Sequence, residues 1–199
     1  MNDNIKFILS LGCTVPALVG IVCYNKIDKK IHPFIWMMLL DVTIETIMFL
    51  SGKYTVIANV AGLCLNLYML IDLWLFLYFI HINNYLSRNI KIIFLSGALI
   101  VAGFNYCNEQ SFFRTFYYLL CYVSAVMLMN SVNILSRQVL VIKESLLNNF
   151  WFWFSSFSIL YNAFTLLIFA VYIFAMRDTP EGRAIGDIQH VVNFTCYIF

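Results

Sequence analysis

Seven stretches of this chain are apolar enough to cross a lipid bilayer as helices, and this feature constrains the fold most strongly. An α-helix rises about 1.5 Å per residue, so it needs about 20 apolar residues to cross about 30 Å of hydrocarbon. The stretches show neither period-two alternation nor short turn-rich segments, which excludes a β-barrel. The seven stretches are 5–24, 33–51, 54–80, 90–106, 111–135, 149–176 and 185–199.

The polar residues are too few to coat a water-soluble globule. Only 11% of the 199 residues are charged and 62% are hydrophobic, whereas a soluble domain carries about 25% charged residues. The net charge of +2 provides no basic field that would hold nucleic acid. Because the connections are short, consecutive helices are expected to be antiparallel neighbours. We therefore predict an all-α, polytopic membrane helix bundle of about seven transmembrane helices, with residues 1–199 in a single domain surrounded by the lipid bilayer.

The distribution of lysine and arginine predicts the orientation of the bundle. The loops after the first, third and fifth stretches hold seven of these residues, and the N-terminus and the other loops hold five. This favours an N-terminus outside and a C-terminus in the cytoplasm. The last stretch, 185–199, reaches only about 22 Å as a helix and stops on apolar residues. We therefore expect the sequence to be truncated within its seventh span.

Ionisable side chains inside a membrane are costly and therefore mark candidate functional sites. Asp41 and Glu45 are four residues apart in the second stretch, on one helix face, and Asp72 lies in the third stretch. Counted from the cytoplasmic helix ends, Asp41 and Asp72 lie about 12 Å deep and Glu45 about 18 Å deep. Four further polar residues lie at about 18–22 Å by the same count: Asn66, Asn162, His190 and Asn193. These seven residues form the candidate binding or proton-relay site.

Three carboxyl groups that converge in a medium of low dielectric constant cannot all stay ionised. At least one is expected to be protonated near neutral pH, because the sequence places no lysine or arginine at that depth. Such a cluster suits a cation, a proton pathway or the cationic part of a small ligand. The alternative is structural, since a protonated acid that hydrogen-bonds a neighbouring helix holds the bundle together. The sequence leaves both open.

Motifs for catalysis and for metal or cofactor binding are missing from the sequence. His32 and His81 are expected near one membrane face, with His190 roughly 20 Å away, so one zinc ion with bonds of about 2 Å could not bind all three. The six cysteines form no CxxC and no short-spaced cluster with histidine, which is typical of buried thiols. GxSxG, HExxH, P-loop and GxGxxG patterns do not occur. The sequence predicts no metal and no cofactor, and it favours a non-enzymatic protein.

Aromatic residues are concentrated where the fifth and sixth helices are expected to begin. The run Phe150-Trp151-Phe152-Trp153-Phe154 opens the sixth stretch. Such runs are typical of the aromatic belts at a membrane interface, and an aromatic vestibule for a ligand is the alternative. The preceding segment, 136–149, mixes charged and apolar residues. We expect it to lie along the membrane surface or to contact a partner.

Several marks along the chain resemble a loose group of bacterial seven-span integral membrane proteins of about this size. The marks are Pro16, Lys30-Ile31-His32-Pro33-Phe34, Glu45, Asp72, the Phe150-Trp151 opening of the sixth stretch, and Tyr161. The resemblance covers nearly the full length. It implies a seven-helix architecture in a bacterial inner membrane and no particular chemistry, because the group has no established activity.

Three functions remain open at this point. The small size, the lack of internal repeats and the missing catalytic motifs favour a non-enzymatic sensory or accessory membrane module that acts with a separate signalling or membrane partner protein. The alternative is a small-solute or ion transporter that uses Asp41, Glu45 and Asp72 as a proton-coupled or cation site. The third is an intramembrane enzyme with an unmarked serine or cysteine nucleophile.

Overall fold

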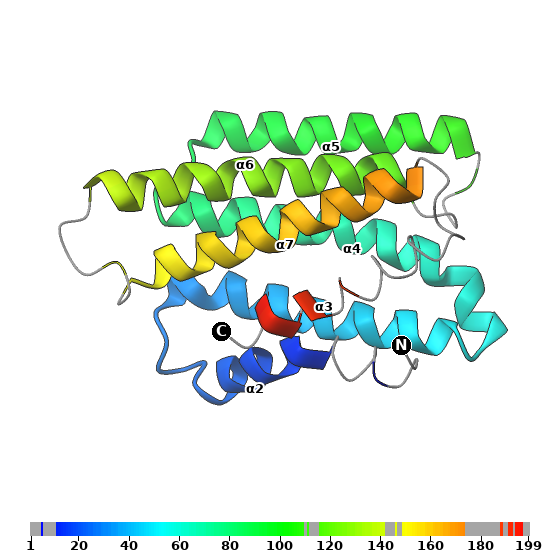
Figure 1. The fold of residues 1–199 in the computed structure, drawn as a ribbon, viewed down its shortest axis with the longest axis horizontal. Helices are drawn as coiled ribbons and strands as arrows, with labels where there is room; N and C mark the ends of the chain where they lie inside the picture. Colours follow the sequence, from blue (N-terminus) through cyan, green and yellow to red (C-terminus); the bar gives the residue numbers. More distant parts are fainter. Residues whose placement is uncertain are drawn as a thin grey trace.

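The computed structural model of the protein consists of helices joined by short loops (Figure 1). It describes residues 5, 11–109, 111, 116–141, 146, 149–173, 188, 191–192 and 194–196. These residues contain no β-strand, so the all-α prediction is confirmed for them. In chain order the elements are η1 (Leu11–Cys13), α2 (Thr14–Val22), η2 (Lys29–Ile31), α3 (His32–Ser51), α4 (Thr55–Ile82), α5 (Arg88–Glu109), α6 (Tyr117–Val141) and α7 (Phe150–Ile173).

Five helices, α3 to α7, are long and apolar enough to cross a membrane. They fall on the second to sixth predicted stretches. Within the predicted first stretch, 5–24, η1 has 3 residues and α2 has 9, together about 18 Å of described helix. The predicted seventh stretch, 185–199, lies mostly outside the described residues, as does its expected truncation. The structure therefore supports five spanning helices, and the seven-span prediction is only partly confirmed.

The long helices pack side by side in antiparallel order (Figure 1). The most extensive packing pairs α3 with α4 and α6 with α7. Helix α4 also contacts α5 and α6, whereas α2 packs on α3. In Figure 1, α5 and α2 accordingly lie at opposite edges of the bundle. Helix α4 supplies the most deeply buried apolar side chains, including Leu73, Leu77 and Phe79, and forms the centre of the fold.

One end of the bundle, where α3, α5 and α7 begin, carries the loops 23–31 and 83–87, with three lysines in the first loop and Arg88 directly after the second; we call it the basic end. Proline is well tolerated in the first turn of a helix, and Pro33 occupies such a position in α3. Asn83 ties the two loops together, because its side-chain amide donates to the carbonyl oxygens of Phe79 (2.9 Å) and Lys30 (3.3 Å). Asn84 has φ of 65°, a left-handed conformation that asparagine adopts more readily than most residues.

Helix α6 continues past the predicted boundary at residue 135, so the expected surface segment does not begin at residue 136. Gln138 lies in this extension of the helix and is buried, with 3% of its surface exposed. Its side-chain amide donates to the Tyr85 hydroxyl, and its oxygen accepts from Asn149 at 2.8 Å. Burial raises the pKa of Tyr85, against smaller lowering effects of Gln138 and Arg137. The last turns of α6 are therefore anchored to the loops on either side.

The close packing of α5 on α6 depends on a glycine. A Cβ atom added at Gly97 would overlap the hydroxyl oxygen of Tyr122, which donates a hydrogen bond to the Phe94 carbonyl at 3.0 Å. We expect Gly97→Ala to displace Tyr122 and to destabilise the protein by about 1–3 kcal/mol, as overpacking typically does. Reversible unfolding in detergent would measure this change.

The matched control is Gly103→Ala on the same helix, where an added Cβ meets no atom within 4 Å. Alanine is the better helix former, so this variant should unfold at the same point or slightly later than the wild type. Equal losses in both variants would contradict a steric role for Gly97.

Candidate functional site

A cavity of about 330 Å³ lies inside the bundle, between the α3–α4 pair and the α6–α7 pair; we call it the central cavity. Its wall is mostly apolar and aromatic, with a small number of polar groups, as is usual for sites that bind small molecules. The described residues that line it are Pro16, Phe34, Met37, Met38, Asp41, Tyr68, Asp72, Phe76, Met127, Phe150, Trp153, Phe154, Phe157, Ser158, Tyr161, Asn162 and Cys196.

Two carboxyl groups from adjacent helices meet in this cavity. Asp41 on α3 is 6% exposed and accepts a hydrogen bond of 2.7 Å from the Tyr68 hydroxyl on α4. Asp72 follows Tyr68 by four residues, so both lie on one face of α4. The carboxyl of Asp72 interacts electrostatically with Asp41, and within the described residues no hydrogen bond reaches it. Asp72 is partly exposed and lines the cavity.

The acidic pair lies near the middle of the helices. Asp41 follows the first residue of α3 by nine positions and Asp72 precedes the last residue of α4 by ten, which is about 14–15 Å along each helix. On α7, Ser158 and Asn162 lie about 12–18 Å from its first residue. The polar groups of three helices thus share one layer, close to the centre of a bilayer about 30 Å thick.

A chain of hydrogen bonds extends this polar layer into the α6–α7 interface. The amide of Asn162 donates to the Ser158 carbonyl (2.8 Å) and to its hydroxyl (3.3 Å). The Ser158 hydroxyl in turn lies 2.7 Å from that of Ser131 on α6. Since Asn162 and Ser131 are at most 3% exposed, these bonds satisfy polar groups in a buried layer and fix α7 against α6.

An aromatic cluster closes the cavity toward the basic end. Phe34 packs edge-on against Phe150 and Phe154, with ring centres 5.9 and 5.7 Å apart. Phe79 stacks on Trp151 at 4.9 Å and meets Phe154 edge-on at 5.2 Å. The run that the sequence assigned to an interfacial belt therefore turns several of its rings inward. The alternative interpretation, an aromatic vestibule, fits the position of Phe150, Trp153 and Phe154 on the cavity wall.

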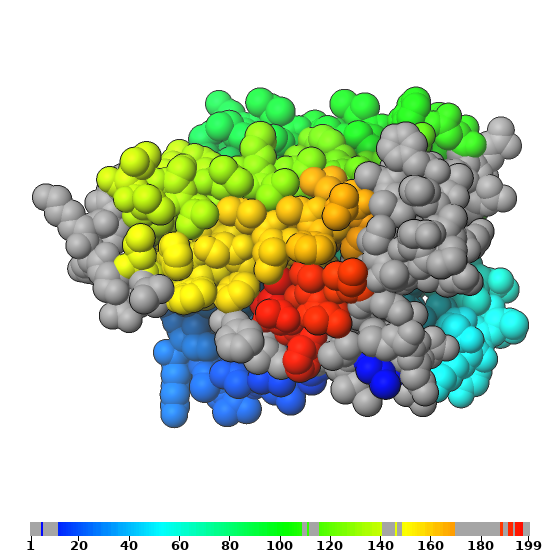
Figure 2. Space-filling view, viewed as in Figure 1, coloured from blue at the N-terminus to red at the C-terminus, as the bar shows by residue number. Residues whose placement is uncertain are grey.

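Segments from the two ends of the chain cover the cavity on a further side. Pro16 of α2 and Cys196 both line it. The two segments contact each other, because a Cβ added at Gly12 would lie 3.0 Å from the ring of Phe194. Figure 2 shows the described C-terminal residues, in red, lying between α7 and α2.

The structure brings together three of the seven residues that the sequence singled out: Asp41, Asp72 and Asn162. Glu45 is partly buried on α3 and is not among the residues that line the cavity; like Asp41, it interacts electrostatically with Cys13 of η1. Asn66 has a structural contact, since its side-chain oxygen accepts from the backbone N–H of Phe116 at 2.9 Å, just before α6 begins. His190 and Asn193 lie outside the described residues.

Sequence reasoning missed four polar or polarisable lining residues: Tyr68, Ser158, Tyr161 and Cys196. Helical spacing carried a signal for three of them. Tyr68 precedes Asp72 by four residues, Ser158 precedes Asn162 by four, and Tyr161 follows Ser158 by three. Side chains three or four residues apart share a helix face. Cys196 had no such signal, because its place depends on a contact between the chain ends.

The chemistry of the cavity favours a positively charged ligand. No lysine or arginine is found among the described lining residues, while two carboxyl groups and several aromatic faces attract a cation. The histidines near the basic end have structural partners: His32 bonds the Tyr24 carbonyl (3.1 Å) and His81 the Leu86 carbonyl (2.8 Å). Over the described part of the chain, no three His, Cys, Asp or Glu side chains are grouped closely enough for a metal ion.

Five long apolar helices around a polar layer are compatible with a multi-pass integral membrane protein. Comparisons with protein-family models, with curated protein sequences and with solved structures give no match for this chain.

Proposed function

We propose that this chain is a non-enzymatic membrane module that binds a small organic cation in the central cavity and acts through a partner protein. The observation that carries the proposal is the acidic pair Asp41–Asp72, at mid-depth in a cavity walled by aromatic rings. An ammonium group beside the pair would be attracted by the carboxyl charge and by the ring faces. The apolar remainder of the wall suits an aliphatic or aromatic body on the same ligand.

The charge balance supports a monovalent ligand. In a site of low dielectric constant, two neighbouring carboxyl groups retain one proton between them and therefore carry one negative charge. A single ammonium group neutralises that charge, whereas a neutral ligand of the same shape leaves it uncompensated. The Tyr68 hydroxyl, 2.7 Å from Asp41, stabilises the ionised form of that carboxyl by donating a hydrogen bond.

The continuity of the helices favours binding of the ligand without its transport across the membrane. Transporters commonly place their sites where membrane helices are broken. Here α3 and α4 run without a break through Asp41 and Asp72. A continuous helix keeps its backbone carbonyls in its own hydrogen bonds, so the ligand would be held by side chains alone.

The second candidate is a transporter of the same cation. It is favoured by the mid-membrane depth of the acidic pair, because a group there is about equally far from both membrane faces. The two carboxyl groups would then exchange a proton for the cation during each cycle. This mechanism requires the cavity to open toward each face in turn.

The proposal is tested by titrating the purified full chain in lipid nanodiscs with phenylethylammonium and, as the control, with phenylethanol. The two probes differ mainly in charge. We expect saturable calorimetric binding of the ammonium probe and at least about tenfold weaker binding of the alcohol, which corresponds to about 1.4 kcal/mol. Equal affinities for the two probes would contradict a cation site.

A transport assay separates the two candidates. Proteoliposomes with a pH gradient should bind radiolabelled phenylethylammonium without accumulating it if the chain is a binding module. Uptake that depends on the gradient would replace the first candidate with the second.

A further inference from the structure

A second hollow, separate from the central cavity, lies on the outer side of α3 and α4; we call it the outer groove. It has a volume of about 650 Å³. The side chains that line it alternate along both helices with those that line the central cavity, so the groove faces away from the acidic pair. The residues that form it are Lys29, His32, Pro33, Trp36, Leu39, Leu40, Thr43, Ile71, Trp74, Leu75, Tyr78 and Ile82.

The length of the outer groove matches one leaflet of a bilayer. On α3 it extends from His32 to Thr43, and on α4 from Ile71 to Ile82. Each is a distance of eleven residues, or about 16 Å at the helical rise. The hydrocarbon core of a bilayer is about 30 Å thick, so the groove runs from the basic end to the middle of the membrane.

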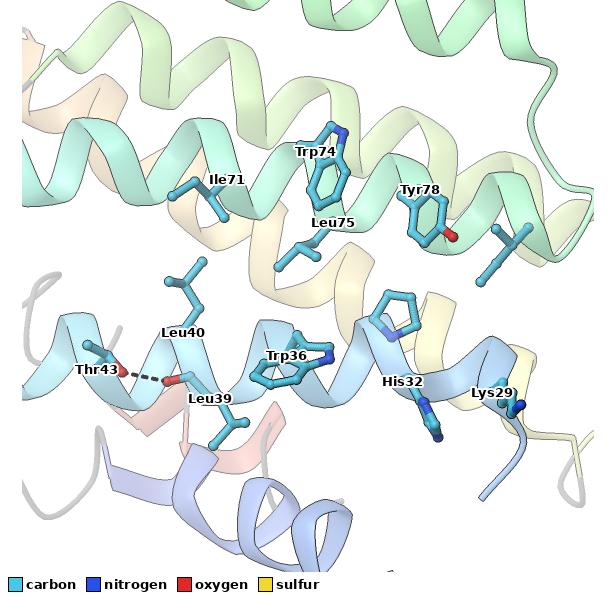
Figure 3. A pocket seen from close by; sticks show the side chains of 12 residues that line it. Lys29, His32, Trp36, Leu39, Leu40, Thr43, Ile71, Trp74, Leu75 and Tyr78 are labelled. Atoms are coloured by element: carbon cyan, nitrogen blue, oxygen red, sulfur yellow. Dashed lines mark hydrogen bonds between the residues drawn. The ribbon is translucent and has the colours of Figure 1, made fainter. Parts of the chain in front are cut away.

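The polarity of the groove changes along this length as that of a phospholipid does. Its deep part is formed by aliphatic side chains, and Thr43, the one hydroxyl among the described residues there, donates to the Leu39 carbonyl at 2.8 Å (Figure 3). Nearer the basic end, Trp36 and Trp74 lie on the facing walls (Figure 3). They are 52% and 47% exposed. Trp36 follows the first residue of α3 by four positions, a depth typical of aromatic side chains near the headgroup boundary.

Positive charge gathers at the shallow end of the groove. Lys29 lies at its mouth (Figure 3). The ammonium group of Lys91 lies 5.6 Å from the ring centre of Tyr78, which stacks on Trp74 at 5.7 Å. Neither lysine forms an ion pair within the described residues. Segments 23–31 and 83–91 together hold five basic residues and one acid, Asp28.

We propose that the outer groove binds an anionic phospholipid from the leaflet at the basic end. One acyl chain lies along Leu39, Leu40 and Leu75, and the phosphate is held by Lys29 and Lys91. Basic pockets between membrane helices on the cytoplasmic side are suited to anionic headgroups, and the charge distribution of the sequence predicts that this end is cytoplasmic. The site does not depend on the function of the central cavity.

Native mass spectrometry of the full chain in detergent tests the headgroup contact. Phosphatidylglycerol and phosphatidylethanolamine with identical acyl chains are the probes. We expect the variant Lys29→Gln/Lys91→Gln to bind phosphatidylglycerol about thirtyfold more weakly, since each basic residue near an anionic surface contributes about fivefold. The control Lys53→Gln removes a lysine that also lies over a ring, 4.1 Å from that of Phe49, at the opposite end of α3. It should leave binding unchanged, and equal binding of the two lipids by the wild type would overturn the proposal.

A second variant tests whether the acyl chain occupies the groove. Leu40→Trp fills the deep part with both lysines present, and we expect it to weaken phosphatidylglycerol binding at least tenfold. Val22→Trp, at a side chain that is 82% exposed on α2 and outside the groove, controls for the added bulk. Unchanged binding in Leu40→Trp would overturn the proposal, even if the lysine variant binds weakly. Circular dichroism confirms that each variant is folded.

Discussion

The variant Asp41→Asn/Asp72→Asn is expected to bind phenylethylammonium at least about a hundredfold more weakly than the wild type. A charge-assisted contact contributes about 1.5–3 kcal/mol, and this variant removes both carboxyl groups that face the central cavity. Asparagine is close to aspartate in size and still accepts a hydrogen bond from Tyr68. The loss should therefore appear in calorimetric affinity, with the unfolding midpoint nearly unchanged.

The single variants should show that the two acids act as a unit. If the pair carries one negative charge, then Asp41→Asn or Asp72→Asn leaves one carboxylate with the same charge. Each single variant should therefore lose about tenfold in affinity or less, and the double variant should lose more than the product of the two. Infrared spectroscopy should show a protonated carboxyl band in the wild type that disappears in either single variant.

Glu45→Gln is the matched control, because Glu45 lies four residues from Asp41 on the same helix but outside the lining of the cavity. It should change the affinity by less than about twofold, well under 1 kcal/mol. An infrared band that persists in both single aspartate variants would argue against a shared proton. If the double variant binds phenylethylammonium as tightly as the wild type, Asp41 and Asp72 have only a structural role in helix–helix contacts.

The variant Phe79→Ala is expected to destabilise the protein by about 3 kcal/mol or more. Phe79 is fully buried on α4 and has ring contacts with Phe34, Phe150, Trp151 and Phe154. Truncation of a buried phenylalanine typically costs about 3–5 kcal/mol, through lost contacts and the cavity that remains. In a membrane protein such packing is a main source of helix association. Unfolding in detergent, followed by tryptophan fluorescence, would measure the change.

Phe104→Ala is the control for the size of the substitution. Phe104 on α5 is 58% exposed and has one ring contact, edge-on with Tyr118 at 6.0 Å. We expect a loss below about 1 kcal/mol, because few contacts disappear. If Phe104→Ala lowers the free energy of unfolding as much as Phe79→Ala does, the buried position of Phe79 is not the cause of its effect.

The helical architecture could be predicted from the sequence because apolar stretches of membrane length have few alternatives. The predicted stretch 33–51 differs from α3 by one residue at its start. The predicted fifth stretch, 111–135, ends six residues before α6 does, for a physical reason. The end of this helix is fixed by the buried hydrogen bonds of Gln138 with Tyr85 and Asn149, and the hydropathy of a segment carries no information about such partners.

The candidate site could be predicted only in part, because the sequence shows which residues are unusual at membrane depth but not which partners they contact. Asp41 and Asp72 stood out because charges at membrane depth are rare. Asn66 has the same depth and polarity, but it bonds the backbone of Phe116, and one sequence cannot distinguish these two roles. The inward orientation of Phe150 and Phe154 depends on how α7 is rotated against α3, which is set by packing between segments more than 100 residues apart.

The contact between Gly12 and Phe194 also determines when the central cavity is completed during synthesis. These residues are 182 positions apart in the chain, and translation proceeds at about 5–20 residues per second. The wall contributed by Pro16 therefore waits about 10 to 40 s for its counterpart at Cys196. During this interval the acidic pair is open to the surrounding lipid on that side. A ligand that enters during this interval would be enclosed when the segment around Cys196 packs beside α2.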